Sequence, residues 1–143
     1  GAEIVQELST LPIGKGVILR EGHSGLVIFA FGPMVSLLRS VAEERDATLV
    51  NLRFVKPLDV ELVLDLTHRH RLIVTAEENV LDGGAGSAVL EALADAGLHR
   101  PVLRLGIDDR FIEHGSRQDN LCAAGLDGAT MRARIETFQA THA

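Results

Sequence analysis

The sequence has no tryptophan and no tyrosine, and phenylalanine supplies only five aromatic side chains. Stacking platforms for nucleic-acid bases are therefore scarce. Acidic residues (20) outnumber lysine and arginine (14), and the resulting net charge of -6 repels a phosphate backbone. We therefore expect no nucleic-acid partner.

Cysteine is almost absent as well, because Cys122 is the only one. A single cysteine cannot form an internal disulfide, and its apolar neighbours Leu121 and Ala123 predict a core position and a reducing, cytoplasmic compartment. No apolar run approaches the roughly 18 residues of a membrane span, so no membrane partner is expected. The start, GAEIVQELST, lacks a signal-peptide pattern and begins with glycine, so we expect a piece of a larger protein.

Short apolar runs alternate with helical patterns along most of the chain. The apolar runs are typical of strands buried on both faces, and the alternation predicts an α/β fold with a mainly parallel sheet. A length of 143 residues suits one domain, which we place at residues 16–143. Residues 1–15 contain a Pro and Gly cluster and are predicted to be a linker segment. The predicted buried strands are residues 26–31, 48–52, 72–76 and 102–105.

Turn and capping residues mark the ends of these elements. Pro33 is suited to a first helical position, Asp59 and Asp127 to helix N-caps, and Gly97 to a helix end. Residues 16–20 have strand propensity, and turn residues join them to the strand at 26–31. The pattern predicts a β-hairpin there.

A glycine-rich loop opens the helix that starts near Ser87. Free backbone N–H groups and the helix dipole make Gly83, Gly84, Gly86 and Ser87 a candidate anion site. The third glycine of a dinucleotide fingerprint and the lysine of a Walker motif are missing. We favour the alternative that these glycines serve a tight turn and close packing.

Two adjacent carboxylates, Glu77 and Glu78, follow a predicted strand and are candidates for an acid and base pair. Successive side chains of an extended segment point to opposite faces, however, so the two cannot easily share a substrate. We favour structural ion pairs with Arg53, Lys56 or a neighbouring domain.

The loop at 108–116 mixes charged and apolar residues. His114 beside Glu113 is a candidate proton relay, or a contact for an anion together with Arg110. We favour a surface loop whose Phe111 and Ile112 dock on the core or on a partner.

Metal binding is not expected within this chain. His68 and His70 are two residues apart on a predicted helix and therefore do not face each other. The other histidines are scattered among turns and the tail, so the sequence contains no cluster at metal-ligand spacing.

Several loops together resemble a known family. LPIGKG at 11–16, RFVKPLD at 53–59, AEENVLDGGAGSAVLE at 76–91, LGIDDRFIEHGS at 105–116 and GLD at 125–127 resemble, in order, the C-terminal domain of 1-deoxy-D-xylulose-5-phosphate synthases. RFVKPLD and FIEHGS are fairly specific to those enzymes. The EEN and GGxGS motifs are shared with other transketolase-type domains, including those of 2-oxo-acid dehydrogenase β subunits, which remain an alternative beside an anion-binding regulatory module.

The resemblance implies a three-layer α/β/α sandwich whose five-stranded, mainly parallel sheet has one antiparallel edge strand. It implies a homodimeric parent transferase that joins pyruvate and glyceraldehyde 3-phosphate with loss of carbon dioxide and feeds isoprenoid, thiamine and pyridoxal synthesis. Thiamine diphosphate and magnesium would be bound by the preceding domains, so no catalytic, cofactor-binding or metal-binding residue is carried onto this chain, which we expect to be inactive alone. Asp108 departs from the family, which often has proline there.

Overall fold

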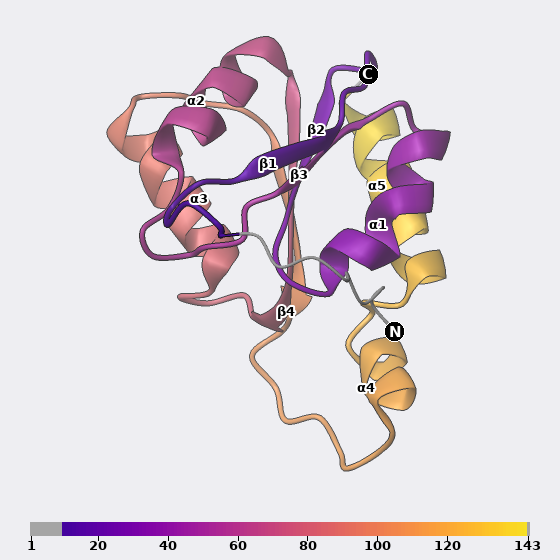
Figure 1. Cartoon of the computed structure of the whole chain (residues 1–143). Coiled ribbons are helices and arrows are strands. Elements are labelled where there is room, and N and C mark those ends of the chain that lie inside the picture. The colour runs from indigo at the N-terminus through magenta and orange to yellow at the C-terminus, as the bar shows by residue number, and fades with distance from the viewer. Residues whose placement is uncertain (1–9, 143) are drawn as a thin grey trace.

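A computed structural model describes residues 10–142, and residues 1–9 of the predicted linker lie outside that range. Strands and helices alternate along most of the chain (Figure 1). The elements are β1 (Val17–Arg20), β2 (Leu26–Ala30), α1 (Met34–Glu44), β3 (Thr48–Asn51), α2 (Val60–Arg69), β4 (Leu72–Val80), α3 (Ala85–Asp95), β5 (Val102–Ile107), α4 (Arg117–Ala123) and α5 (Gly128–Thr141).

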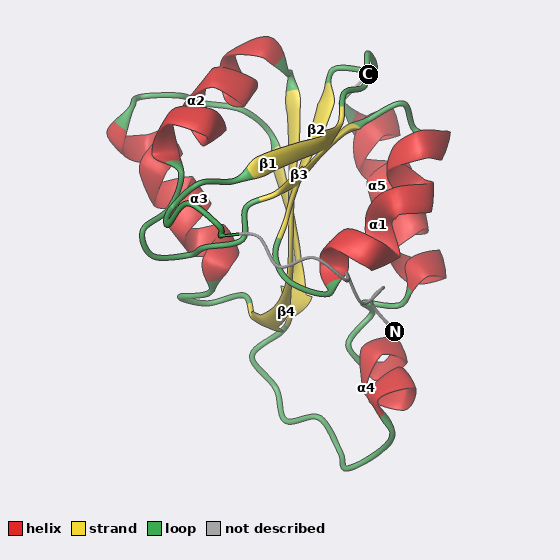
Figure 2. Cartoon of the chain, viewed as in Figure 1, coloured by secondary structure: helices red, strands yellow, loops and turns green. Residues whose placement is uncertain are grey.

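The strands form one five-stranded sheet in the order β1-β3-β2-β4-β5. All neighbouring pairs are parallel except β1 with β3, which makes β1 an antiparallel edge strand. Helices α2 and α3 cover one face of the sheet and α1 and α5 the other (Figure 2). The predicted three-layer α/β/α sandwich with a mixed, mainly parallel sheet is therefore confirmed.

The predicted hairpin between β1 and β2 is wrong. β1 pairs instead with β3, with Val17 opposite Asn51, and β2 lies between β3 and β4. The connecting turn crosses over the start of β3, where a Cβ on Gly22 would collide with the Asp46 backbone. Only glycine permits this close approach, which carries the chain past β3 before β2 begins.

Alternating side chains of the central strands build a separate core on each face of the sheet. Ile28 packs with α1 and α5, whereas its neighbour Phe29 packs with α2 and α3, and both are fully buried. Continuous burial of β2 on both faces is the reason its sequence is an unbroken apolar run.

The helix ends largely follow the sequence signals. Asp59 and Asp127 cap α2 and α5 through hydrogen bonds from backbone N–H groups, as predicted. Leu126 and Met131, on either side of the second cap, are both fully buried. No helix within residues 10–142 is both long and apolar enough to cross a membrane.

Helix α4 was not predicted, and it corrects the placement of Cys122. This short helix buries Leu121, and its C-cap Ala124 three residues later is also buried, whereas Cys122 is exposed. The Sγ atom lies 3.6 Å from the amide nitrogen of Gln118 rather than in the core.

The outer edge of the sheet at β5 carries a side-chain cap. Arg134 of α5 donates a hydrogen bond of 3.1 Å to the backbone carbonyl of Arg104 in this edge strand. The side chain of Arg104 reaches the opposite way, toward Ser87 and Asp82.

Candidate functional site

The carboxyl ends of the four parallel strands meet at one edge of the sheet, where ligands of open α/β folds usually bind. The connections that leave this edge are residues 31–33, 52–59, 81–84 and 108–116. In Figure 1 the last of them, together with α4, extends below the sandwich, beyond both helical layers. The site residues that the sequence singled out lie in these loops or at the adjoining ends of β4 and α3.

Glu77 is the acceptor at the start of α3. Its carboxylate accepts hydrogen bonds from the N–H groups of Ala85, at 2.6 Å, and Gly86, at 2.7 Å. The side chain is buried, with a relative exposure of 2%, and its charge complements the positive end of the helix dipole. The N–H groups proposed for an external anion therefore hold a carboxylate of the protein itself.

The glycines of this loop allow the close packing. A Cβ on Gly84 would collide with the Val80 carbonyl and the Glu77 carboxylate, and one on Gly86 would lie 2.6 Å from Thr75 Oγ1. These contacts favour the packing interpretation over ligand binding.

The two remaining candidates of the loop complete its turn. Gly83 has a left-handed backbone, with φ of +70°. The hydroxyl of Ser87 donates to the Leu81 carbonyl at 3.0 Å and accepts a hydrogen bond from Arg104 at 3.3 Å. Gly83 therefore shapes the turn, whereas Ser87 binds groups within the chain.

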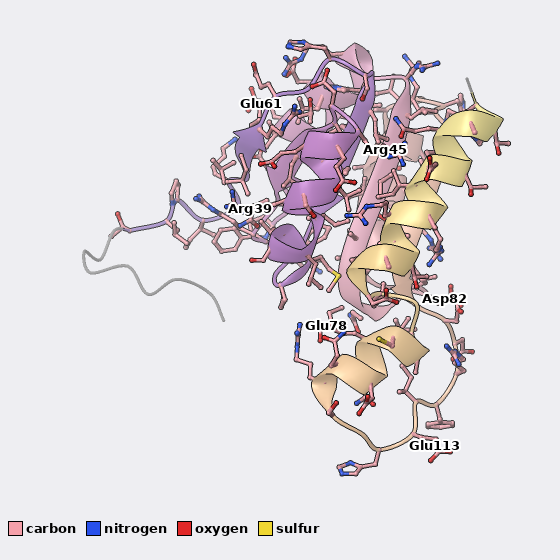
Figure 3. The ribbon with its side chains drawn as sticks, turned by 90° about the vertical axis from the view of Figure 1, so that its right-hand side faces the viewer. Arg39, Arg45, Glu61, Glu78, Asp82 and Glu113 are labelled. Atoms are coloured by element: carbon pink, nitrogen blue, oxygen red, sulfur yellow. The ribbon has the colours of Figure 1, made fainter. Side chains whose placement is uncertain are left out.

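Glu78 points away from Glu77 and binds a different element. Its carboxylate forms an ion pair of 2.6 Å with Arg117 at the start of α4. The expected partners Arg53 and Lys56 are not those that either glutamate binds. Figure 3 shows Glu78 where α4 meets the sheet, with Glu113 at the far end of the loop.

The loop at 108–116 does not assemble the predicted anion contact. The guanidinium of Arg110 turns back to the Ala123 carbonyl of α4, and His114 is exposed. No hydrogen bond between described residues joins His114 to Glu113 or Arg110. Ile112 packs against the core as expected, but Phe111 is fully exposed.

The sequence analysis named Arg53 only as an ion-pair partner and missed its left-handed backbone, with φ of 59°. The side chain of Asn51 supports this turn by accepting a hydrogen bond of 3.0 Å from the Arg53 N–H. A positive φ is uncommon for arginine, and the sequence carries no signal that predicts it. Arg117 was also missed, although serine at an N-cap followed by aspartate is a helix-start signal.

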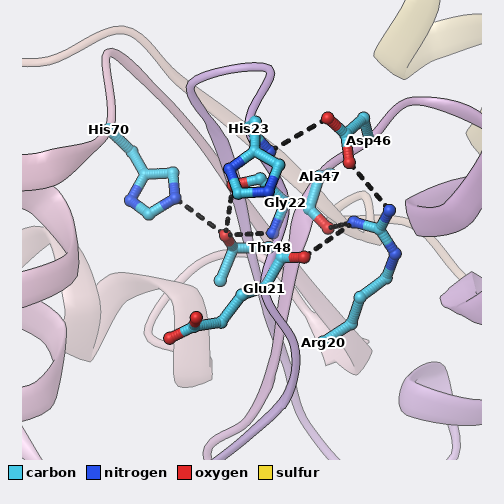
Figure 4. Close-up of polar contacts among 8 residues, drawn as sticks. All are labelled: Arg20, Glu21, Gly22, His23, Asp46, Ala47, Thr48 and His70. Carbon is cyan, nitrogen blue, oxygen red and sulfur yellow. Dashed lines mark hydrogen bonds and ion pairs between the residues drawn. The ribbon is translucent and has the colours of Figure 1, made fainter.

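A second polar cluster lies at the opposite, amino edge of the sheet (Figure 4). His70 is buried, and its ring nitrogens lie 2.7 Å from the Leu66 carbonyl and 2.8 Å from Thr48 Oγ1. Because a carbonyl only accepts, Nδ1 donates to Leu66, and Nε2 shares the second hydrogen bond with the Thr48 hydroxyl. The same hydroxyl accepts from the Gly22 N–H at 3.0 Å.

A hollow of about 370 Å³ adjoins this cluster, lined in part by Glu21, His23 and Arg69. The turn above it is tied to Asp46, whose carboxylate binds Arg20 at 2.8 Å and the His23 N–H at 3.1 Å. Hydrogen bonding to Arg20 is the main cause that lowers the pKa of Asp46. These contacts serve mainly to close the amino edge.

Two observations bear on whether residues 10–142 could hold a diphosphate or a metal ion. Within this range no group of three or more His, Cys, Asp or Glu side chains is placed to hold a metal ion. The helix start that most resembles a phosphate cradle is filled by Glu77.

The fold and its loop set define a transketolase-type C-terminal domain. A solved structure titled split gene transketolase, inactive beta4 tetramer, matches with a TM-score of 0.81 and 31% identity, over 91% of this chain and 44% of that one. The chain belongs to the family described as Transketolase, C-terminal domain, which matches residues 14–131. The match begins near Lys15 and Gly16, both of which bind Asp59.

The resemblance seen in the loops is confirmed by curated relatives. The 1-deoxy-D-xylulose-5-phosphate synthase of Cupriavidus metallidurans is 50% identical over 99% of this chain, and that of Thioalkalivibrio sulfidiphilus is 50% identical over 94%. The synthase of Methylobacillus flagellatus is 49% identical over 95%. The chain spans only 23%, 22% and 22% of these proteins, in that order.

Proposed function

We propose that this chain is the C-terminal, non-catalytic domain of a 1-deoxy-D-xylulose-5-phosphate synthase. The parent would be a cytoplasmic, homodimeric transferase that condenses pyruvate with glyceraldehyde 3-phosphate and releases carbon dioxide. The observation that carries this proposal is the combination of about 50% identity to such synthases with a carboxyl edge whose helix start is filled by Glu77.

The domain's role is to support the parts of the polypeptide that precede it and to extend subunit assembly. Those preceding domains would hold thiamine diphosphate and magnesium. The thiamine diphosphate would supply the carbanion chemistry there. The alternative of an anion-binding regulatory module has less support, because its best donors already bind a carboxylate.

A chimera tests the proposal. The matching C-terminal segment of the Cupriavidus metallidurans synthase is replaced by this chain, and product formation is compared with the intact synthase and with a truncated form that lacks the segment. We expect the chimera to be active and the truncated form to be much less active. The domain of the split gene transketolase, 31% identical, gives a matched control graft for specificity.

Calorimetry on the isolated chain supplies the second measurement. We expect no tight binding of thiamine diphosphate with magnesium. Tight binding would overturn the assignment of the cofactor to the preceding domains. A chimera no more active than the truncated form would contradict the assignment to this synthase.

A further inference from the structure

The loop at 108–116 carries an apolar side chain that the domain itself does not use. Phe111 has a relative exposure of 103%, whereas its neighbour Ile112 packs against the core. We propose that Phe111 anchors this domain to the preceding domains of the synthase by entering an apolar pocket with a basic rim. This inference rests on the proposed function and names the contact through which it acts.

Contacts on both sides of Phe111 fix the position of the loop that carries it. On one side Arg110 binds the Ala123 carbonyl, and on the other Ser116 caps α4 with a hydrogen bond of 3.2 Å from the Asp119 N–H. The ion pair of Arg117 with Glu78 fixes α4 to the end of β4. Because the loop is already fixed, Phe111 would lose little conformational freedom on binding, as expected of an interface anchor.

The charges around Phe111 indicate the chemistry of the partner. Residues 108–119 contain four acidic side chains and two arginines, and both arginines bind groups of this chain. The carboxylates of Asp108, Asp109 and Glu113 are exposed and take part in no ion pair among the described residues. A partner surface that meets them must carry positive charge around the pocket for Phe111.

The negative charge of the loop also indicates which partner binds Phe111. A second copy of the loop would bring the same uncompensated carboxylates face to face, which costs free energy. The synthases that this chain resembles are several times longer, since the chain spans 23% of the Cupriavidus metallidurans protein. We therefore assign this contact to the preceding domains, which would belong to the same polypeptide.

Footprinting of the chimera tests the contact directly. Hydroxyl-radical labelling of Phe111 is compared between the isolated chain and the chimera, with exposed Val60 of α2 as the internal control. We expect labelling of Phe111 to fall about tenfold in the chimera, as for a side chain at the centre of an interface, and labelling of Val60 to stay unchanged.

Binding in trans adds a mutational test. The isolated chain is titrated into the truncated synthase as wild type, Phe111→Ala, Glu113→Lys and, as the matched control, Val60→Ala. We expect a dissociation constant raised about tenfold or more for Phe111→Ala, a smaller rise for Glu113→Lys, and a change below about twofold for Val60→Ala.

The outcomes separate the two proposals. Equal labelling of Phe111 in the isolated chain and in an active chimera would overturn this inference and leave the proposed function intact. Protection that grows with the concentration of the isolated chain would assign the anchor to a second copy and overturn it as well. An inactive chimera that still protects Phe111 would instead contradict the proposed function alone.

Discussion

The two edges of the sheet are built differently. At the amino edge the turn before β2 folds back on the sheet, and Thr48 joins it to His70 through hydrogen bonds. At the carboxyl edge Glu77 closes the inner loop, but residues 108–116 extend beyond the sheet (Figure 1). Within this loop Phe111 is fully exposed. The amino edge is closed by contacts within the domain, whereas the carboxyl edge leaves a large apolar side chain exposed.

This difference teaches that polar residues at the expected ligand edge need not form a ligand site. The glycine loop has the composition of an anion cradle, but the protein supplies the anion through Glu77. The outward face of the same edge contains the features that the domain's own stability does not require. We therefore propose that this edge serves contact with other domains rather than catalysis.

The largest expected effect is at the inner carboxyl edge. Glu77→Gln replaces one carboxylate oxygen by an amide NH2 that faces a helix N–H and leaves it unsatisfied. We expect a loss of about 3 kcal/mol in the free energy of unfolding, measured with urea. The matched control Glu78→Gln breaks a pair whose side chains are 29% and 57% exposed, and we expect about 0.5 kcal/mol. Similar losses for the two variants would contradict the contrast between these neighbours.

A smaller effect is expected at the amino edge. Thr48→Val keeps the shape of the side chain but removes the hydroxyl that links Gly22 to His70, so we expect a loss of about 1–2 kcal/mol by urea unfolding. Thr67 is a close control, because it is also fully buried and its hydroxyl has no partner among the described residues. Thr67→Val should be neutral or stabilising. If Thr48→Val were equally harmless, the amino edge would not be closed by this hydroxyl.

The smallest effect concerns pH, at the cap of α2. Burial raises the pKa of Asp59, but hydrogen bonds from the Gly16 N–H and from Lys15 outweigh it, so the pKa lies below its ordinary 3.8. A lowered pKa in the folded state stabilises the fold above the unfolded value, and this contribution is lost as pH falls below 3.8.

Urea unfolding at pH 7 and at stepwise lower pH measures that loss. Asp59→Asn keeps a capping oxygen but cannot titrate, so its stability should fall less steeply below the ordinary aspartate pKa. Parallel curves for wild type and variant would show that Asp59 contributes nothing to the acid sensitivity of this edge.

Most of the sandwich could be predicted from the sequence because its strands are buried on both faces. Runs such as residues 26–31 and 72–76 have no other place in a domain of this size than the centre of a sheet. Capping residues such as Asp127 act within a few residues of themselves, and local sequence therefore determines them.

The predictions that were wrong depend on contacts between residues far apart in the sequence. Nothing local distinguishes pairing of β1 with β2 from pairing with β3, since the crossing depends on the contact of Gly22 with Asp46. Helix α4 is too short to display a period, so the exposure of Cys122 could not be read from its neighbours. The hydrogen bonds from the first N–H groups of α3 to Glu77 likewise depend on packing between β4 and a loop.

The cap on β5 has a consequence for how molecules of this kind meet. An edge strand with free backbone groups recruits further strands and leads to fibres or swapped chains. Arg134 occupies the Arg104 carbonyl, and an incoming strand would have to displace a charged guanidinium from it. Removal of that arginine would free this carbonyl for an incoming strand, so the side chain that caps the sheet also opposes edge-to-edge association.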